Sequence, residues 1–310
     1  MGLTIIKGGE KMADVKEIRK IKIKPITLMS STISAVLAFI GAIIFALAIG
    51  VVSMFLPPQL APLGSALAGF GITAIIAYPI LTFLIGLSTV FLSVLLYNML
   101  VPRVGGVKLA MDGNNVAALP IVPFALILSI IMAIWTFIIG LLITTALLPL
   151  TSAIGTAIPM IANATNGTAT GAGFGALVAF GAVFFIIILP ILVFIFGFIG
   201  HALFAVFYNY IATRAAKIQL NFEALTEGWF KLIDIPIVPA ALALAVISAI
   251  FAFLNGLLNL FAFSDITAGI ISLIVTTIGN FIWTFIIVAI AVFLYNFLAP
   301  RIGAIKLALE

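Results

Sequence analysis

Residues 97–112 read YNMLVPRVGGVKLAMD, and this stretch decides the fold because the chain repeats it. The same phrase returns as YNYIATRAAKIQLNFE at 208–223 and as YNFLAPRIGAIKLALE at 295–310. No gap is needed over the sixteen columns. Tyrosine, asparagine, arginine and leucine are identical in all three copies, and an acidic residue closes each one. The sequence therefore predicts three tandem repeats.

The composition is that of an integral membrane protein. Hydrophobic residues make up 65% of the chain and charged residues only 7%, whereas a soluble domain carries about 25% charged residues. A membrane-spanning helix needs roughly 20 apolar residues. Six stretches satisfy this requirement, at about 28–54, 66–100, 122–150, 174–212, 239–263 and 267–298.

Each predicted repeat combines two spans with one copy of the motif. Residues 1–16 form an N-terminal tail, followed by repeat 1 (17–112), repeat 2 (113–223) and repeat 3 (224–310), with Pro25, Pro120 and Pro236 matched at the start of spans 1, 3 and 5. Two spans per repeat make the repeats parallel, which weighs against an inverted-repeat transporter. Residues 1–11 admit a second interpretation, as a ribosome-binding sequence read in frame before a start at Met12.

The charges predict the orientation in the membrane. Every one of the 14 Lys and Arg residues lies before the first span, in the 103–119 and 214–236 connections, or after the last span. Only one acidic residue, Asp265, lies on the opposite side. Basic residues mark the cytoplasmic side, so we expect a multi-pass protein of the cell membrane with both termini in the cytoplasm. The middle outer loop carries two glycosylation patterns, at Asn163 and Asn166.

Alternating residues on the cytoplasmic side predict a small β cap. Residues 106–119 read as a hairpin with its turn at 112–114, and residues 216–235 as a longer hairpin. The segments 17–24 and 304–310 alternate like the two halves of a third hairpin. Unpaired strands would leave exposed edges, so we expect these segments to pair antiparallel. The shared face would hold Ile21, Ile23, Ile305, Leu307 and Leu309.

This pairing would close the three repeats into a pseudo-threefold ring. The predicted fold is thus an all-α polytopic membrane protein. Its six transmembrane helices form three parallel two-helix repeats above a six-stranded cytoplasmic β cap of short strands.

The identical polar residues of the motif are the candidate site. The amphipathic tyrosine ring suits the headgroup level, and asparagine at a helix end can bond to free carbonyls or across to a neighbour. Arginine can reach a lipid phosphate or a neighbouring repeat's carbonyls, after Pro102 and Pro300 stop their helices. Two interpretations stay open, a structural helix exit and a site for lipid headgroups or another ligand. The nine residues are Tyr97, Asn98, Arg103, Tyr208, Asn209, Arg214, Tyr295, Asn296 and Arg301.

Polar residues inside the spans are few. His201, the only histidine, reads as a hydrogen-bonded residue between helices or as a proton relay. Asn255, Asn259 and Asn280 read as interhelical hydrogen-bonding residues or as a polar vestibule. The chain has no cysteine, and no span contains an acidic or basic residue in its interior. We therefore expect no catalytic residues, no metal site, no cofactor and no enzymatic activity.

The end of each repeat resembles a family of uncharacterised two-span bacterial membrane domains, best known from actinobacteria. The resemblance rests on Tyr97, Asn98 and the glycines 105–106 with VKL, and on Tyr295, Asn296 and Gly303 with IKL. The middle copy departs from it, with alanines 215–216 assigned to the glycine positions. The resemblance implies a cytoplasmic lead-in, two helices and the terminal motif, and it implies no activity.

Two functions remain compatible with the sequence. The first is a non-catalytic membrane scaffold or accessory subunit, whose cytoplasmic face binds a membrane or cytoplasmic protein partner or the headgroups of anionic lipids. The second is a channel or transporter for an ion or small solute along the pseudo-threefold axis, although the spans offer only scattered Ser, Thr and Asn to line it. Orientation and contact with anionic lipid explain the basic surplus, so we expect no nucleic-acid partner.

Overall fold

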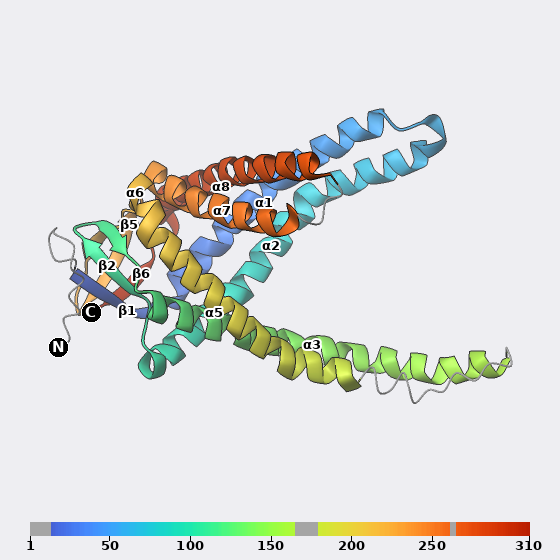
Figure 1. Ribbon diagram of the computed structural model, residues 1–310, viewed down its shortest axis with the longest axis horizontal. Coiled ribbons are helices and arrows are strands. Elements are labelled where there is room, and N and C mark those ends of the chain that lie inside the picture. The colour runs from blue at the N-terminus through green and yellow to red at the C-terminus, as the bar shows by residue number, and fades with distance from the viewer. Residues whose placement is uncertain (1–13, 165–178, 261–264) are drawn as a thin grey trace. The chain divides into compact units, whose positions relative to one another are not determined.

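The computed structural model describes residues 14–164, 179–260 and 265–310. The chain divides into two compact units, which are described separately (Figure 1). The larger unit combines Met1–Pro120 with Phe204–Glu310, and the smaller one is Ile121–Leu203. The predictions about residues 1–11 and about Asn166 lie outside the described residues.

Six helices in the described part of the chain are long and apolar enough to cross a membrane. They coincide with the six predicted spans to within a few residues at most ends. Their surfaces expose many large apolar side chains, as lipid-facing helices do. The chain is therefore a multi-pass membrane protein. The six are Ile23–Met54, Ala61–Val104, Ile121–Ala146, Ala179–Ala215, Ile237–Leu260 and Ile266–Ile302.

The helices pack as sequential pairs within each unit. In the larger unit, α1 (Ile23–Met54) packs along α2 (Ala61–Val104), and α7 (Ile237–Leu260) packs along α8 (Ile266–Ile302). A short turn with the 3₁₀ helix η1 (Pro58–Leu60) joins the first pair. In the smaller unit, α3 (Ile121–Ala164) contacts the π-helical turn η2 (Phe184–Ile188), which leads into α5 (Leu189–Phe207).

Two predicted boundaries are wrong at α1 and α3. Helix α1 begins at Ile23, so the first strand ends at Ile21 and does not reach residue 24. Helix α3 continues to Ala164, through residues that we assigned to the outer loop. Four of the fourteen residues at 151–164 are alanine, the residue that favours a helix most.

The prolines of the motif do not stop their helices. Helix α2 continues past Pro102 to Val104, and α8 continues past Pro300 to Ile302. A proline in the last turn removes only one backbone donor, which a helix end tolerates. The helices end instead at Gly105 and Gly303, whose φ angles of 85° and 101° an α-helix cannot adopt.

Six short strands form a single antiparallel sheet in the larger unit. Its order is β3-β2-β1-β6-β5-β4, so the first and last strands of the chain lie together in the middle. The strands are β1 (Asp14–Ile21), β2 (Lys108–Asp112), β3 (Asn115–Ala118), β4 (Asn221–Ala224), β5 (Trp229–Asp234) and β6 (Lys306–Leu309).

The predicted antiparallel pairing of the terminal strands is confirmed. Ile18 lies opposite Leu309 and Ile21 lies opposite Leu307, with an irregularity in register between the two pairs. The pairing continues past the strand, because the Lys22 N–H donates to the Lys306 carbonyl at 3.0 Å. Ile23 does not belong to the shared strand face, because the helix has already begun there.

Both predicted hairpins are also confirmed. Strands β2 and β3 pair around a two-residue turn at Gly113 and Asn114, and Gly113 has a φ of 60°. Strands β4 and β5 pair across residues 225–228, where Glu227 and Gly228 have positive φ angles of 62° and 73°. The ladder between β5 and β6 joins the second hairpin to the C-terminal strand.

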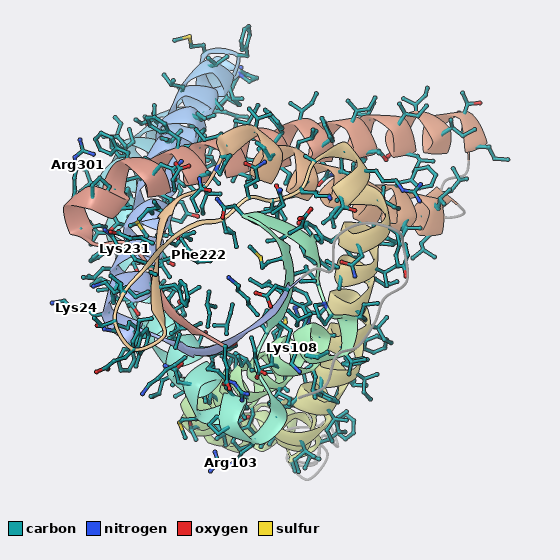
Figure 2. All side chains as sticks on the ribbon, turned by 90° about the vertical axis from the view of Figure 1, so that its left-hand side faces the viewer. Lys24, Arg103, Lys108, Phe222, Lys231 and Arg301 are labelled. Carbon is teal, nitrogen blue, oxygen red and sulfur yellow. The ribbon has the colours of Figure 1, made fainter. Side chains whose placement is uncertain are left out.

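The two outer edges of the sheet meet, which closes it into a barrel. Residues 218–220, just before β4, pair antiparallel with β3. The Val116 N–H donates to the Ile218 carbonyl and the Leu220 N–H donates to the Asn114 carbonyl, both at 2.8 Å. The strands form a ring when viewed from the end of the molecule that carries them (Figure 2). The contact between residues 114–116 and 218–220 thus joins the two edges of the sheet.

The two faces of the barrel differ in polarity. Residues that lie opposite each other in antiparallel strands share a face. Phe230 pairs with Leu307 and Phe222 with Leu232, and Phe222 lies on the inner side of the ring in Figure 2. Lys231 lies between Phe230 and Leu232 in β5, so its side chain points to the outer face. The apolar side of β2 and β3 is buried as well, at Leu109, Met111 and Val116.

Candidate functional site

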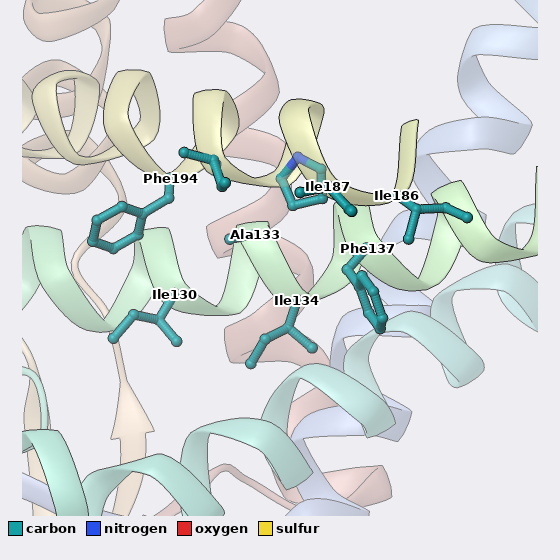
Figure 3. Close-up of a pocket in the computed structure, with 9 residues that line it drawn as sticks. Ile130, Ala133, Ile134, Phe137, Ile186, Ile187 and Phe194 are labelled. Atoms are coloured by element: carbon teal, nitrogen blue, oxygen red, sulfur yellow. The ribbon is translucent and has the colours of Figure 1, made fainter. Parts of the chain in front are cut away.

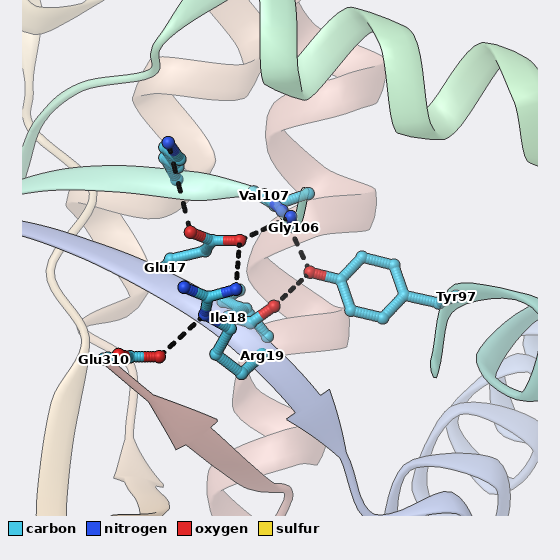
Figure 4. Close-up of polar contacts among 8 residues, drawn as sticks. Glu17, Ile18, Arg19, Tyr97, Gly106, Val107 and Glu310 are labelled. Atoms are coloured by element: carbon cyan, nitrogen blue, oxygen red, sulfur yellow. Dashed lines mark hydrogen bonds and ion pairs between the residues drawn. The ribbon is translucent and has the colours of Figure 1, made fainter. Parts of the chain in front are cut away.

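The three motif tyrosines are buried and make the same pair of hydrogen bonds. Tyr97 is 5% exposed, Tyr208 is 0% exposed and Tyr295 is 4% exposed. Each hydroxyl donates to a carbonyl of the strand that precedes its helix pair, and accepts an N–H ten residues after the tyrosine. In the first copy the Tyr97 hydroxyl donates to the Ile18 carbonyl at 2.7 Å and accepts from the Val107 N–H at 2.9 Å (Figure 4). In the other copies the partners are Val116 and Ile218 for Tyr208, and Leu232 and Ile305 for Tyr295.

The three asparagines bond to the residue three positions further along, at the end of the same strand or just after it. The Asn98 side-chain oxygen accepts from the Ile21 N–H, and its amide donates to the Ile21 carbonyl, both at 2.9 Å. One side chain thus satisfies both backbone groups of a residue, as a neighbouring strand would. The same pair of bonds recurs for Asn209 with Leu119 and for Asn296 with Ile235.

We call each such set of four hydrogen bonds a Tyr–Asn clamp. A clamp fastens the end of one helix to the strand before the helix pair, and through the tyrosine to the segment that follows the helix. Buried polar groups destabilise a fold unless they are paired, and here the tyrosine and asparagine groups bond to the backbone. The outcome favours the structural interpretation of these six residues. We did not predict the clamp partners.

The three arginines take no part in the clamps. Arg103 and Arg301 are exposed, and each donates to a carbonyl of its own helix, four residues back: Met99 at 2.8 Å for Arg103, and Phe297 for Arg301. The Arg301 guanidinium also lies 3.7 Å from the centre of the Phe297 ring. Arg214 is exposed at the end of the helix pair, in α6 (Thr213–Ala215). The expected bonds from these arginines to a neighbouring repeat's carbonyls are therefore not formed by Arg103 or Arg301.

The middle copy differs in its helix end. Tyr208–Ala212 form the π-helical turn η3, and Thr213 stands where the other copies have proline. The Thr213 hydroxyl donates to the Asn209 carbonyl at 2.8 Å. A threonine hydroxyl can thus bond to the carbonyl at i−4.

Our assignment of alanines 215–216 to the glycine positions is off by one residue. The gap-free columns place Ala216 with Gly105 and Lys217 with Gly106. Ala216 has a φ of −158°, which any residue adopts, so glycine is not needed there. Gly106 is needed where it stands, because an added Cβ would lie 2.3 Å from the Ile18 carbonyl oxygen. Its N–H donates to the buried Glu17 carboxylate at 2.7 Å (Figure 4).

The clamps also set the register of the first helix in each repeat. In each repeat a proline lies four positions after the residue that the asparagine binds. These prolines are Pro25, Pro123 and Pro239. Matching Pro25 with Pro120 and Pro236 was therefore wrong by three residues. The clamp register reveals further identical columns that the sequence comparison missed. They include Ala35, Ala133 and Ala249, and Phe39, Phe137 and Phe253.

Two grooves along the helix pairs are lined at equivalent positions. One, of about 460 Å³, lies between α3 and the η2–α5 segment and includes Ala133, Phe137 and Phe194 (Figure 3). The other, of about 370 Å³, lies between α7 and α8 and includes Ala249, Phe253 and Phe281. Both are apolar, so each suits a hydrocarbon chain rather than a polar solute.

His201 is hydrogen-bonded between two helices of the smaller unit, as one of its two interpretations expects. Its Nδ1 lies 3.1 Å from the Ser129 hydroxyl, and its ring meets Phe124 edge-on. The Ser129 hydroxyl donates its proton to the Ala125 carbonyl at 2.6 Å. The bond to His201 therefore needs a proton on Nδ1, which the histidine donates to the serine oxygen.

The membrane asparagines do not link helices as we expected. The Asn259 amide bonds to Asn255 of its own helix, and the Asn280 amide donates to the Thr276 carbonyl at 2.9 Å. An interhelical bond between side chains instead joins Thr284 to Ser248 at 2.8 Å. Within the described residues, no group of three His, Cys, Asp or Glu side chains could hold a metal ion.

Comparisons of the chain with protein-family models, with curated proteins and with solved structures find no significant match. The resemblance to the two-span bacterial domains therefore stays a prediction, and the site must be interpreted from its own geometry.

Proposed function

We propose that the protein is a non-catalytic membrane scaffold or accessory subunit. Three parallel two-helix repeats, related by a pseudo-threefold axis, hold the β barrel at the cytoplasmic face as a platform for a protein partner. One observation carries this proposal: the repeated tyrosines and asparagines are engaged in hydrogen bonds to the barrel's own backbone. The tyrosines and asparagines that recur in all three repeats thus hold the barrel together and are not presented to a solute.

The outer face of the barrel offers the groups that a partner would contact. Arg19 pairs with Glu310 at 2.8 Å and Lys231 with Glu223 at 3.4 Å, and all four side chains are at least a third exposed. Mixed charges of this kind give specificity to protein association more than affinity. The same basic residues suit the headgroups of anionic lipids at a cytoplasmic surface.

The barrel interior weighs against the channel alternative. An eight-stranded barrel is only just wide enough for its side chains to fill it, and this barrel has six strands. Its inner face carries Phe222, Phe230 and Leu307, and the Lys16 ammonium lies 5.6 Å from the centre of the Phe230 ring. A narrow interior occupied by these side chains supports a packed platform rather than an axial path for ions.

The scaffold and channel functions predict different results for the purified protein. We expect extraction from native membranes in mild detergent to yield a stoichiometric protein partner. Neutralising the outer-face cations with Arg19→Gln and Lys231→Gln should release that partner while the barrel stays folded. Reconstituted protein should give no conductance in planar bilayers. Conductance in the absence of any partner would contradict the scaffold function.

The orientation has its own prediction. A reporter inserted after Gly113, at the tip of the β2–β3 hairpin, should report the cytoplasm. A reporter within 163–168 should report the opposite side. Each position is tested with two reporters, one that is active only outside the cytoplasm and one that is active only inside it. If both reporters lie on the same side, the cytoplasmic placement of the barrel and the parallel repeats are both wrong.

A further inference from the structure

One stretch of strand edge in the barrel has no neighbouring strand. The segment 218–220 pairs with β3, and its last bond joins the Leu220 N–H to the Asn114 carbonyl. The β2–β3 hairpin turns back at this point, around Gly113 and Asn114. Strand β4 continues past the tip of that hairpin. Among the described residues, the edge at 222–224 therefore faces no other strand.

The register of β4 against β5 shows which backbone groups point to this edge. In an antiparallel pair, hydrogen-bonded and non-hydrogen-bonded pairs of residues alternate. The Leu225 N–H donates to a carbonyl of β5 at 2.7 Å, so Leu225 and Glu223 direct their backbone groups to β5. Phe222 and Ala224 alternate with them. Their N–H and C=O groups therefore point away from β5, to the same side as those of Leu220.

This edge is accessible and carries no protecting residue. Exposed strand edges pair with extended segments of other chains, and proteins commonly blunt such edges with lysine or proline. The sequence of β4, NFEA, contains neither. Its one charged side chain, Glu223, is already paired with Lys231 of β5 at 3.4 Å. Glu223 and Ala224 are both exposed, so an added strand could reach the free backbone groups.

The charges around the edge select the chemistry of the added strand. Asp112 at the hairpin tip and Glu227 in the turn after β4 lie beyond its two ends, and both are exposed. Neither forms an ion pair within the described part of the chain. Opposite charges on facing strands stabilise a sheet, and like charges destabilise it. A basic segment therefore suits the edge better than a second copy of β4, because antiparallel pairing centred on Glu223 would bring two carboxylates together.

We propose that the platform binds its protein partner at this edge, where an extended basic segment of the partner pairs antiparallel with β4. The backbone groups of Phe222 and Ala224 would supply the hydrogen bonds. Asp112 and Glu227 would attract the lysine or arginine side chains of the segment, which would lie in line with β3. The inference rests on the proposed function, because it places the contact on the barrel that serves as the platform.

A proline at residue 224 tests the backbone contact. Proline has no N–H and is tolerated on an edge whose N–H faces away from the ladder, so Ala224→Pro removes the outward donor and keeps the bonds to β5. Ala224→Val is the matched control, since valine suits a strand and keeps the N–H. The probes are short labelled peptides of alternating lysine and valine, or of alternating glutamate and valine. Fluorescence anisotropy with the full chain in phosphatidylcholine nanodiscs gives their affinity, and empty nanodiscs correct for binding to lipid.

We expect the lysine peptide to bind the wild type and the Ala224→Val variant equally, and the glutamate peptide not to bind. Ala224→Pro should weaken binding of the lysine peptide about fivefold, the loss expected for one backbone hydrogen bond. Hydrogen–deuterium exchange in fragments that contain residues 222–224 should slow when the lysine peptide is added. Asp112→Asn combined with Glu227→Gln should also weaken binding, because it removes the two attracting charges.

Equal affinity of the proline and valine variants for the lysine peptide would overturn the proposal, as would its failure to bind the wild type. Equal binding of the glutamate peptide would overturn it too. Self-association of the chain that Ala224→Pro abolishes would assign the edge to a second copy and reject a basic partner. If Ala224→Pro does not fold, the Asp112→Asn, Glu227→Gln variant decides, and an affinity equal to that of the wild type would overturn the proposal.

Failure of this test and failure of the proposed function are distinguishable. If the lysine peptide does not bind, β4 is not the docking edge, and the scaffold function still stands on the stoichiometric partner. Conductance of the reconstituted chain would reject the scaffold function whatever the peptide does.

Discussion

Replacing Tyr208 by phenylalanine is expected to lower the free energy of unfolding by about 2–4 kcal/mol, because two buried backbone groups lose their partner at once. The Tyr208 side chain is completely buried. Its hydroxyl donates to the Val116 carbonyl at 2.7 Å and accepts from the Ile218 N–H at 3.2 Å. These two residues belong to the pair of segments that closes the barrel. The lost hydrogen bonds therefore weaken the contact that closes it.

Tyr210 provides the matched control for this change. It lies two residues later in the same π-helical turn and is 63% exposed. Tyr210→Phe removes the same oxygen and should change stability by no more than about 0.5 kcal/mol. Unfolding in mixed micelles, followed by tryptophan fluorescence, measures both variants. Equal stabilities for the two variants would show that the clamp of the middle copy contributes nothing.

The architecture could be predicted from the sequence where a pattern repeats. Six apolar stretches give six helices because a bilayer requires that length of hydrocarbon. Alternation in 17–24 and 304–310 gave the pairing of β1 with β6, because an unpaired alternating strand leaves an exposed edge. The turn at Gly113 followed from its residues. The closure of β3 onto residues 218–220 was not predicted.

The ends of elements were predicted less well. Proline was read as a stop signal at Pro102, but in the last helical turn it removes only one donor, and the glycine that follows decides the end. Residues 151–164 were assigned to the outer loop, and they continue α3. Residues that weaken a helix do not exclude one when the neighbouring turns are strongly helical.

The candidate site was predicted as a set of residues but not as a set of contacts. The identical columns identified Tyr97 and Asn98 and their counterparts. Their partners are backbone groups of residues such as Ile18 and Ile21, and any side chain supplies those atoms, so no residue type in the sequence indicates them. The three-residue spacing of the partners could be recognised only after the strands were placed. Arg103 was grouped with the clamp by its identity alone, and its bond is local to its own helix.

The first helices of the three repeats were not aligned correctly from the sequence, because their alignment needs the register that the clamps provide. The sequence alignment had instead been anchored on Pro120 and Pro236, three residues out of phase. A departure from a repeat is informative only once the repeat is correctly aligned.

Closure of the chain through its terminal strands is the central claim, and a disulfide between β1 and β6 tests it most directly. Glu17 and Glu310 exchange both backbone hydrogen bonds, at 2.7 and 3.1 Å. The adjacent pair, Ile18 and Leu309, is therefore the non-hydrogen-bonded kind, with Cα atoms about 4.5 Å apart. That separation lies within the range that a disulfide spans, about 4.4–6.8 Å. The chain has no cysteine of its own, so an engineered pair has no competitor.

Ile18→Cys combined with Leu309→Cys should form an intramolecular disulfide on mild oxidation in membranes, seen as a mass loss of two hydrogens with no dimer. Val15→Cys with Leu309→Cys is the control, because Val15 pairs with Ala110 of β2 and not with β6. The account predicts nearly complete cross-linking of the first pair and little of the second. Absence of the 18–309 disulfide, or cross-linking only between chains, would contradict the closed ring.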